Sequence, residues 1–305
     1  MNISTRLKGI KLKNPTILAS GILGTTGSSL ANVAANGAGA VTSKSIGLDE
    51  RFGHPNPVLV EWEKGFINAV GLSGPGIEEG IEELGYAVKN SSAPVIASIF
   101  ASTVDDFGSV ARKISKAKPH LIEVNISCPN VESEFGRPFG TDPDISAKVT
   151  KAVKRNTSVP VIVKLSPNVP NIRLIAEAVR KAGADIINAI NTVGPGMVIN
   201  IDAAKPVLHN KMGGVSGPAI KPVAVRCVYD IYEATDGKIP IIGTGGVTYG
   251  CDAVEMFMAG ASAVGIGTGV YYRGIDIFRK VSEEIAEFMD KNNHDSLKDI
   301  IGKAH

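Results

Sequence analysis

Eight short apolar segments, separated by longer amphipathic ones, constrain the fold of this chain more than any other feature. The short segments have the length and β-branched content of buried strands, and the segments between them carry apolar residues at helical spacing. The predicted strands are 16–20, 38–44, 94–99, 120–127, 160–165, 184–191, 239–243 and 262–267. The clearest predicted helices are 104–118, 145–155, 172–181, 220–234 and 252–259.

Repeated strand and helix units in a chain of 305 residues favour a closed α/β barrel, the (β/α)8 or TIM barrel, which commonly uses about 250 residues. We therefore expect a single domain over residues 1–305. An open Rossmann-like sheet is the alternative architecture. No Gly-x-Gly-x-x-Gly motif follows the first predicted strand, where that fold would need one.

Three connections are longer than a simple barrel needs, and each follows a strand: 46–75, 128–143 and 192–218. In a barrel they would form extended loops on the C-terminal face, where barrel enzymes place their chemistry. Part of 192–218 is predicted to form a small added hairpin. Residues 3–12 are predicted to form an N-terminal hairpin that closes the opposite end. The polar tail, 290–305, is expected to be only partly ordered.

Composition gives no general reason to expect nucleic acid or a membrane as a partner. The formal net charge is +2, and no apolar run reaches the roughly 18 residues of a membrane span. The N-terminus lacks the pattern of a secretion signal, so a cytoplasmic location is expected. Three cysteines without a Cys-x-x-Cys pair and five scattered histidines predict neither a disulfide framework, nor a cysteine-ligated cluster, nor a metal site.

A cysteine and two carboxamides end the fourth predicted strand, in the sequence Asn-Ile-Ser-Cys-Pro-Asn at 125–130. A thiol between groups that donate and accept hydrogen bonds is typical of an acid or base beside a planar polar substrate. The alternative is that Cys128 is an inert buried thiol. Cys227 and Cys251 are interpreted as packing residues.

Lysines end two otherwise apolar strands, Lys44 after the second and Lys164 after the fifth. Burying an unpaired ammonium is costly, so each side chain either reaches solvent or pairs with an electron-rich ligand. Two lysines at equivalent strand ends favour the ligand.

Glycine-rich segments follow the last two strands, at 243–246 and 265–269. Exposed backbone amides at such loops bind phosphate, and barrels often place a phosphate site after strands seven and eight. A phosphate-bearing ligand beside Lys164 suits flavin mononucleotide (FMN), because a nearby ammonium stabilises the reduced flavin. Pyridoxal phosphate bound to Lys164 as a Schiff base is the competing interpretation.

Ordered motifs through nearly the whole chain resemble the class 1 dihydroorotate dehydrogenases. They are TSKS at 42–45, NAVGL at 68–72, NISCPN at 125–130, VKLSP at 163–167, NT at 191–192, GGVSGPA at 213–219, GGV at 245–247 and GT at 267–268. The resemblance implies an FMN-containing barrel that oxidises (S)-dihydroorotate to orotate in de novo pyrimidine biosynthesis. It implies that Cys128 removes the C5 proton while the C6 hydride passes to flavin N5. A serine at position 128 would instead resemble the membrane-linked class 2 enzymes.

The same resemblance assigns site residues position by position. Those matching the substrate contacts are Lys44, Asn68, Ala69, Val70, Gly71, Leu72, Asn125, Asn130, Asn191 and Thr192. Those matching the FMN contacts are Ser20, Lys44, Ser45, Asn125, Lys164, Ile190, Gly217, Gly245, Gly246, Gly267 and Thr268. Where the family often has an asparagine after strand three, this chain has the shorter Ser98, so that contact is not carried over.

Residues 68–71 and 210–217 look most like the 1B subgroup, in which a partner subunit carrying FAD and a 2Fe-2S cluster passes electrons to NAD. The resemblance therefore implies a heterotetramer around a homodimeric core. The alternatives are a fumarate-dependent 1A enzyme, another flavin barrel, and a non-catalytic barrel that binds a phosphate-bearing ligand. The sequence leaves three roles open for Trp62 and Phe66: part of a lid, part of the core, or a subunit contact.

Overall fold

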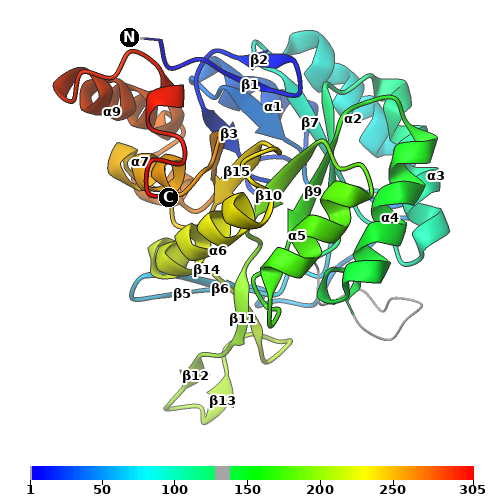
Figure 1. The fold of residues 1–305 in the computed structure, drawn as a ribbon. Helices are drawn as coiled ribbons and strands as arrows, with labels where there is room; N and C mark the ends of the chain where they lie inside the picture. Colours follow the sequence, from blue (N-terminus) through cyan, green and yellow to red (C-terminus); the bar gives the residue numbers. More distant parts are fainter. Residues whose placement is uncertain (1, 128–137) are drawn as a thin grey trace.

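The computed structural model describes residues 2–127 and 138–305, and a closed parallel barrel lies at its centre (Figure 1). The barrel strands are β3 (Thr16–Leu18), β4 (Ala40–Thr42), β7 (Val95–Ile99), β8 (Leu121–Asn125), β9 (Val161–Leu165), β10 (Ile186–Ala189), β15 (Ile241–Thr244) and β16 (Ala263–Ile266). They follow one another around the barrel in chain order, and β16 pairs with β3 to close it. Each predicted strand overlaps one of these eight, which confirms the (β/α)8 architecture.

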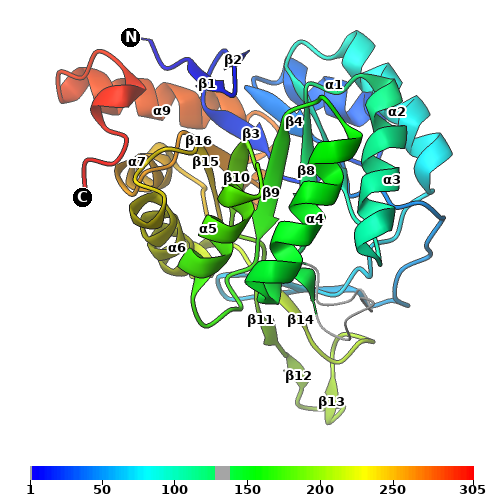
Figure 2. The same ribbon diagram turned by 45° about the vertical axis from the view of Figure 1, so that its right-hand side comes forward.

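Helices cover the outside of the barrel (Figure 2). They are α1 (Gly27–Ala35), α2 (Ile77–Asn90), α3 (Val104–Ile114), α4 (Pro143–Asn156), α5 (Ile172–Lys181), α6 (Lys221–Ala234), α7 (Gly250–Met258), α8 (Gly269–Arg273) and α9 (Ile277–Lys291). Helix α5 has the predicted bounds because Asn171 caps it by accepting from Arg173 N, while apolar residues from Ile172 to Val179 face the barrel. No helix in the described part of the chain is both long and apolar enough to cross a bilayer.

An N-terminal hairpin closes one end of the barrel, as predicted. It consists of β1 (Thr5–Leu7) and β2 (Ile10–Leu12), paired antiparallel. Leu7 and Leu12 are fully buried against apolar side chains inside the barrel. Thr5 Oγ1 also donates to Ser262 O at 3.0 Å, just before β16 begins. The hairpin therefore serves as an apolar plug.

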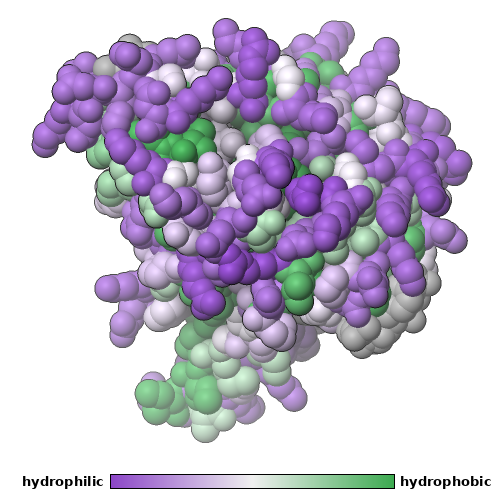
Figure 3. Space-filling view, in the orientation of Figure 1, coloured by the Kyte–Doolittle hydropathy of each residue, from purple (hydrophilic) through white to green (hydrophobic). Residues whose placement is uncertain are grey.

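The long connections build a second sheet at the other end of the barrel (Figure 1). Its strands are β5 (Leu59–Trp62), β6 (Gly65–Asn68), β11 (Val193–Gly196) and β14 (Gly213–Ser216), in the order β11-β14-β6-β5. The predicted added hairpin is present as β12 (Ile199–Asn200) and β13 (Lys205–Pro206). It projects from the molecule, and its surface is apolar at the tip (Figure 3). The pairing of β6 with β14 was not predicted.

The polar C-terminal tail is ordered, so the expectation of partial order was wrong. After α9, a short 3-10 helix (Leu297–Asp299) buries Leu297, and Ile300 is buried beside it. The ring of His305 stacks on that of Tyr229 with centroids 3.8 Å apart. A few apolar and aromatic residues, widely spaced along the sequence, anchor this segment. Because the rest of the segment is polar, its composition does not indicate these contacts.

Candidate active site

The inside of the barrel changes from apolar to polar within two residues on five strands. Side chains alternate in direction along a strand, so residues two apart face the same side. Ile96, Leu121, Ile162, Ile186 and Ile242 belong to the apolar cluster that packs on the N-terminal hairpin. Two residues further along the same strands, toward the C-terminal face, stand Ser98, Glu123, Lys164, Asn188 and Thr244. We call these five the polar layer.

Glu123 is the centre of the polar layer. Its Oε1 accepts from Ser98 Oγ at 3.2 Å, and its Oε2 accepts from Asn188 Nδ2 at 2.6 Å. Asn188 Oδ1 in turn accepts from Thr244 Oγ1 at 2.7 Å. The carboxylate is almost completely buried. Since β8 and β10 are not neighbours in the barrel, the bond to Asn188 crosses the interior.

Lys164 provides the positive charge of this layer. Its side chain is buried, so the alternative that it reaches solvent is wrong. Nζ lies 4.0 Å from Glu123 Oε1, which is an ion-pair distance but too long for a hydrogen bond. Nζ makes no hydrogen bond to any of the residues the structure describes. An ammonium with its donors free at the inner wall of a barrel is suited to an electron-rich ligand.

A chain of polar side chains leads from the polar layer to the mouth of the barrel. Ser45 Oγ lies 2.9 Å from Ser98 Oγ and accepts from Asn125 Nδ2 at 3.2 Å. Asn125 Oδ1 accepts from Ser127 Oγ, which accepts from Asn191 Nδ2 at 2.6 Å. Three of the predicted site residues, Ser45, Asn125 and Asn191, are therefore connected.

Thr192 and Asn68 join this group through the second sheet. Asn68 pairs with Gly214, and Asn68 Nδ2 donates to Gly214 O at 3.4 Å. A Cβ on Gly214 would overlap Thr192 Oγ1, so the glycine admits the threonine hydroxyl. The connection after β4, which contains Asn68, and the connection after β10, which contains Thr192, thus meet at this point. Ala69 and Val70 continue directly from Asn68.

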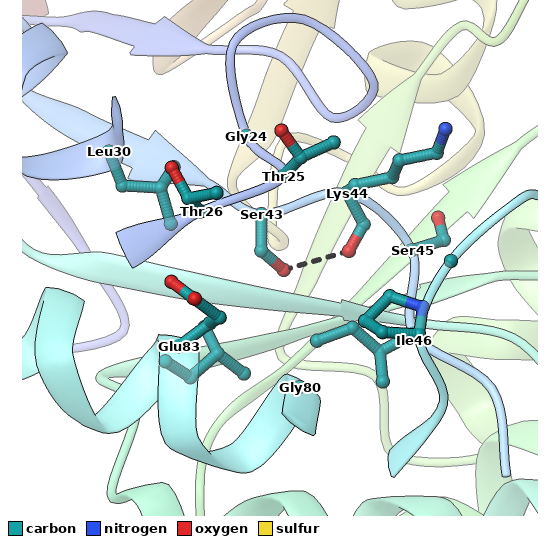
Figure 4. Close-up of a pocket in the computed structure, with 13 residues that line it drawn as sticks. Gly24, Thr25, Thr26, Leu30, Ser43, Lys44, Ser45, Ile46, Gly80 and Glu83 are labelled. Carbon is teal, nitrogen blue, oxygen red and sulfur yellow. Dashed lines mark hydrogen bonds between the residues drawn. The ribbon is translucent and has the colours of Figure 1, made fainter. Parts of the chain in front are cut away.

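Lys44 lies at the end of β4 beside the segment that contains Gly71 and Leu72. Its Nζ donates to Ser73 Oγ at 3.0 Å. Burial lowers the pKa of Lys44, because desolvation disfavours the charged form. A pocket runs from Lys44 between β4, α1 and α2, and the Lys44 side chain points away from Thr26 and Glu83 in it (Figure 4). The Lys44 amino group is thus directed away from this end of the pocket and toward Ser73, to which it donates.

The predicted phosphate-site glycines lie close to one another. A Cβ on Gly246 would meet Gly217 O at 3.1 Å, and a Cβ on Gly245 would lie 3.5 Å from Ile190 Cγ1. Both glycines and Gly217 have positive φ, of +136°, +76° and +104° for Gly245, Gly246 and Gly217. The structure thus brings together Ile190 and the glycine loops that follow β14 and β15.

Gly267 and Thr268 border the same region. A Cβ on Gly269 would lie 2.7 Å from Val247 O, so the loops after β15 and β16 are in contact. At Gly267 a Cβ would meet nothing closer than 3.7 Å, at Ala19 Cβ next to Ser20. A Cβ at Gly267 would thus be in van der Waals contact with Ala19 and Ile22. Backbone amides of neighbouring glycine loops form a site that suits a phosphate group.

Two predicted site residues, Cys128 and Asn130, lie outside the described residues. Elsewhere Cys227 is buried, as a packing residue should be, and burial raises its pKa to about 11. Cys251 is exposed, so its interpretation as a packing residue was wrong. Among the described residues, no group of three or more His, Cys, Asp or Glu side chains is arranged to hold a metal ion.

The structure shows how two aromatic residues left open above pack within the chain. Phe66 is buried and its ring meets that of Tyr271 edge to face, with centroids 4.9 Å apart. Trp62 packs on the small apolar cluster that contains Ile67 and Leu208. Both side chains therefore belong to the packing of the second sheet.

Sequence reasoning missed three members of the polar layer, Glu123, Asn188 and Thr244. The predicted site residues stand at the strand ends, whereas these side chains lie deeper inside the barrel. A signal was available, because Glu123 and Asn188 each interrupt an apolar strand, as Lys164 does. A buried carboxylate in such a position needs partners.

Comparison with known proteins supports the family suggested by the motifs. The family model for dihydroorotate dehydrogenase matches residues 2–289. The catalytic subunit of dihydroorotate dehydrogenase B (NAD(+)) from Methanosarcina mazei is 50% identical over 98% of this chain and 94% of its own length. The proteins of the same name from Methanocaldococcus jannaschii and Pyrococcus abyssi are 49% and 45% identical over 99% of this chain, and over 98% and 99% of their own lengths. This chain belongs to the dihydroorotate dehydrogenase family, and its similarity is to the catalytic subunits of the B type.

Proposed function

We propose that this protein is the catalytic subunit of an FMN-dependent dihydroorotate dehydrogenase that oxidises (S)-dihydroorotate to orotate in pyrimidine biosynthesis. The observation that carries the proposal is the buried Lys164 ammonium, which makes no hydrogen bond within the described part of the chain and pairs with Glu123 in the polar layer. Membership of the family supplies the substrate, because relatives of about 50% identity over nearly the full chain carry this name.

The polar groups at the mouth fit the shape of the substrate. Orotate presents a carboxylate, which Lys44 would bind, and an imide edge that pairs with carboxamides through matched donors and acceptors. Asn125 and Asn191 are connected through Ser127, Asn68 bonds to Gly214, and all three would bind this edge. Thr192, Asn130 and the backbone of residues 69–72 complete the proposed substrate contacts.

The residues present also fit FMN. The residues that would hold its phosphate with backbone amides, where the loops after β14, β15 and β16 come together, are Gly217, Gly245, Gly246, Gly267 and Thr268. Lys164 would place its ammonium at the electron-rich edge of the ring, and Ser20, Lys44, Ser45, Asn125 and Ile190 would line it. Bound FMN supplies a hydride acceptor for the C6 hydrogen of the substrate.

Cys128 is proposed as the base that takes the C5 proton. A free thiol has a pKa near 8.5, so Cys128 acts near neutral pH only if its surroundings favour the thiolate. Asn125 and Ser127, just before it in the chain, have their side chains fixed by hydrogen bonds. The residues leading to Cys128 are therefore preorganised, which limits the entropy lost in the reaction.

A second subunit is proposed as the electron acceptor, carrying FAD and a 2Fe-2S cluster and passing electrons to NAD. The relatives' names, which specify a catalytic subunit and NAD(+), support this proposal. The projecting hairpin supports contact with another chain, because Met197, Ile199 and Ile201 are exposed on it (Figure 3). We propose a homodimer of this chain as the core of the complete assembly.

Purification of the protein from its native cells tests the proposed function. We expect a yellow protein that releases FMN on denaturation, copurifies with a second flavoprotein, and reduces NAD when dihydroorotate is added. Fumarate reduction without a partner would place it with the 1A enzymes instead. A colourless protein that leaves dihydroorotate unchanged would contradict the proposal.

A further inference from the structure

We propose that Glu123 is a positioning residue that pairs with Lys164, joins the two halves of the site and, through its own charge, lowers the reduction potential of the flavin. The inference rests on the proposed function, because it concerns the same FMN site. It adds a residue that neither the motifs nor the family resemblance assigned, and it gives that residue an electrostatic role.

The geometry makes Glu123 the connection between the two halves of the site. Through Ser98 and Ser45, its Oε1 is linked to Asn125 on the substrate side. Through Asn188, its Oε2 is linked to Thr244, which directly precedes Gly245 on the phosphate side. One buried carboxylate thus accepts the hydrogen bonds that fix both halves relative to each other.

The surroundings of Glu123 suit a carboxylate. Ser98 and Asn188 both donate to it. The Lys164 ammonium lies 4.0 Å away as its ion-pair partner. The glycine at position 265 leaves room for these partners. A Cβ there would overlap Thr244 Oγ1 and displace the hydroxyl that donates to Asn188.

An ionised Glu123 opposes the effect of Lys164 on the flavin. Reduction adds negative charge to the ring, which the ammonium stabilises, so Lys164 alone would raise the reduction potential. The carboxylate 4.0 Å from Nζ cancels part of that charge inside a buried site, where screening is weak. The reduced flavin is therefore held less firmly, which favours the onward transfer of its electrons.

Glu123→Gln tests this role, because glutamine has the same shape and removes only the charge. In the purified, flavin-loaded protein we expect the midpoint potential to rise by about 30 mV or more, which is a tenfold change in the ratio of reduced to oxidised flavin. Reduction by dihydroorotate should stay at least as fast, while reoxidation slows. A purely structural role would slow both steps and leave the potential unchanged.

Asp185→Asn is the matched control. Asp185 precedes β10 at the opposite end of the barrel, and its carboxylate is also paired with lysines, Lys154 at 2.6 Å and Lys8 at 3.3 Å. Its loss should lower stability without moving the potential. Glu123→Asp keeps the charge but withdraws it by one methylene, so its potential should lie between those of wild type and Glu123→Gln. It also provides the test if the glutamine variant does not fold.

The outcomes separate this inference from the proposed function. If wild type binds FMN and oxidises dihydroorotate, but the Gln and Asp variants both keep the wild-type potential, the inference fails and the proposed function stands. An equal shift in Asp185→Asn would also overturn the inference, because the effect would then be a general one. A wild-type protein without flavin would contradict the proposed function, and the inference would fall with it.

Discussion

The two ends of the barrel interior use the same strands for opposite purposes. Toward the N-terminal hairpin, side chains such as Ile96, Leu121 and Ile162 form an apolar cluster with Leu7 and Leu12. Two residues further along, the polar layer is held by hydrogen bonds and an ion pair centred on Glu123. The comparison indicates that apolar packing at one end stabilises the fold. At the other end, the folded barrel holds charged and polar groups in fixed positions.

The difference follows from the cost of burying polar groups. An apolar side chain stabilises the fold by leaving water, whereas a buried carboxylate or ammonium gains stability only through its partners. Substitutions at the two ends should therefore differ in kind. Those at the apolar end should change only the free energy of unfolding, whereas those at the polar end should also change flavin binding, catalysis or both.

The largest effect is expected at the mouth of the polar end, for Cys128→Ala. If Cys128 is the base, turnover should fall by about 10²–10⁴-fold while the flavin remains bound, because the substitution removes a proton acceptor and leaves the cofactor contacts unchanged. Steady-state assays with dihydroorotate and an artificial acceptor measure this. Cys251→Ala is the control, since Cys251 is an exposed thiol in α7. An alanine variant at 128 with wild-type turnover would remove Cys128 from the mechanism.

Lys164→Ala should be the next largest, with a loss of about 3–5 kcal/mol in the free energy of unfolding, because it leaves the Glu123 carboxylate buried without its cation. Flavin should also bind more weakly. Denaturant unfolding of the flavin-free protein separates the two effects. The double variant Lys164→Ala with Glu123→Gln should recover part of the lost stability. If the double variant is no more stable than the single one, the two charges do not depend on each other.

At the apolar end, Ile162→Ala should cost about 2–5 kcal/mol in the free energy of unfolding by leaving a cavity under the plug. Its kcat and KM should stay close to wild type at a temperature where the variant is folded. Thermal unfolding and kinetics on the same sample check both parts. A large change in kcat in the folded variant would show that the two ends are not separable.

Sequence patterns predicted the barrel well because each strand is a short β-branched run between helices. They failed where structure depends on pairing between distant segments. Gly213–Ser216 has little strand character of its own, and it becomes β14 because it pairs with β6. Glu123 was missed for a similar reason, since its partners Ser98 and Asn188 come from other strands and only the closed barrel brings them together.

The smallest expected effect is a pH dependence at Lys44. Burial lowers the Lys44 pKa, so the ammonium that would bind the orotate carboxylate is fully present only below that lowered value. Orotate affinity should therefore fall as the pH rises through it, by at most about tenfold per pH unit. The sign reverses for the unliganded protein, in which the desolvated ammonium lowers stability in full below this pKa, and the cost fades as the pH rises from this pKa to the unfolded-state value of 10.5.

Titration of bound flavin absorbance with orotate, from neutral to alkaline pH, measures this dependence. Lys44→Arg provides the comparison, since arginine stays protonated throughout the range. Its affinity should depend less on pH than that of wild type. Equal slopes for the two proteins would assign the pH dependence to a group other than Lys44.

Anaerobic mixing of the purified, flavin-loaded protein with dihydroorotate shows whether the site carries out the proposed reaction. We expect the flavin absorbance to bleach in a single turnover, with one orotate formed per flavin reduced. Ile162→Ala, altered only at the apolar end, should bleach at close to the wild-type rate. A flavin that stays oxidised in the presence of dihydroorotate would show that the protein does not oxidise this substrate, whatever the fold of the chain.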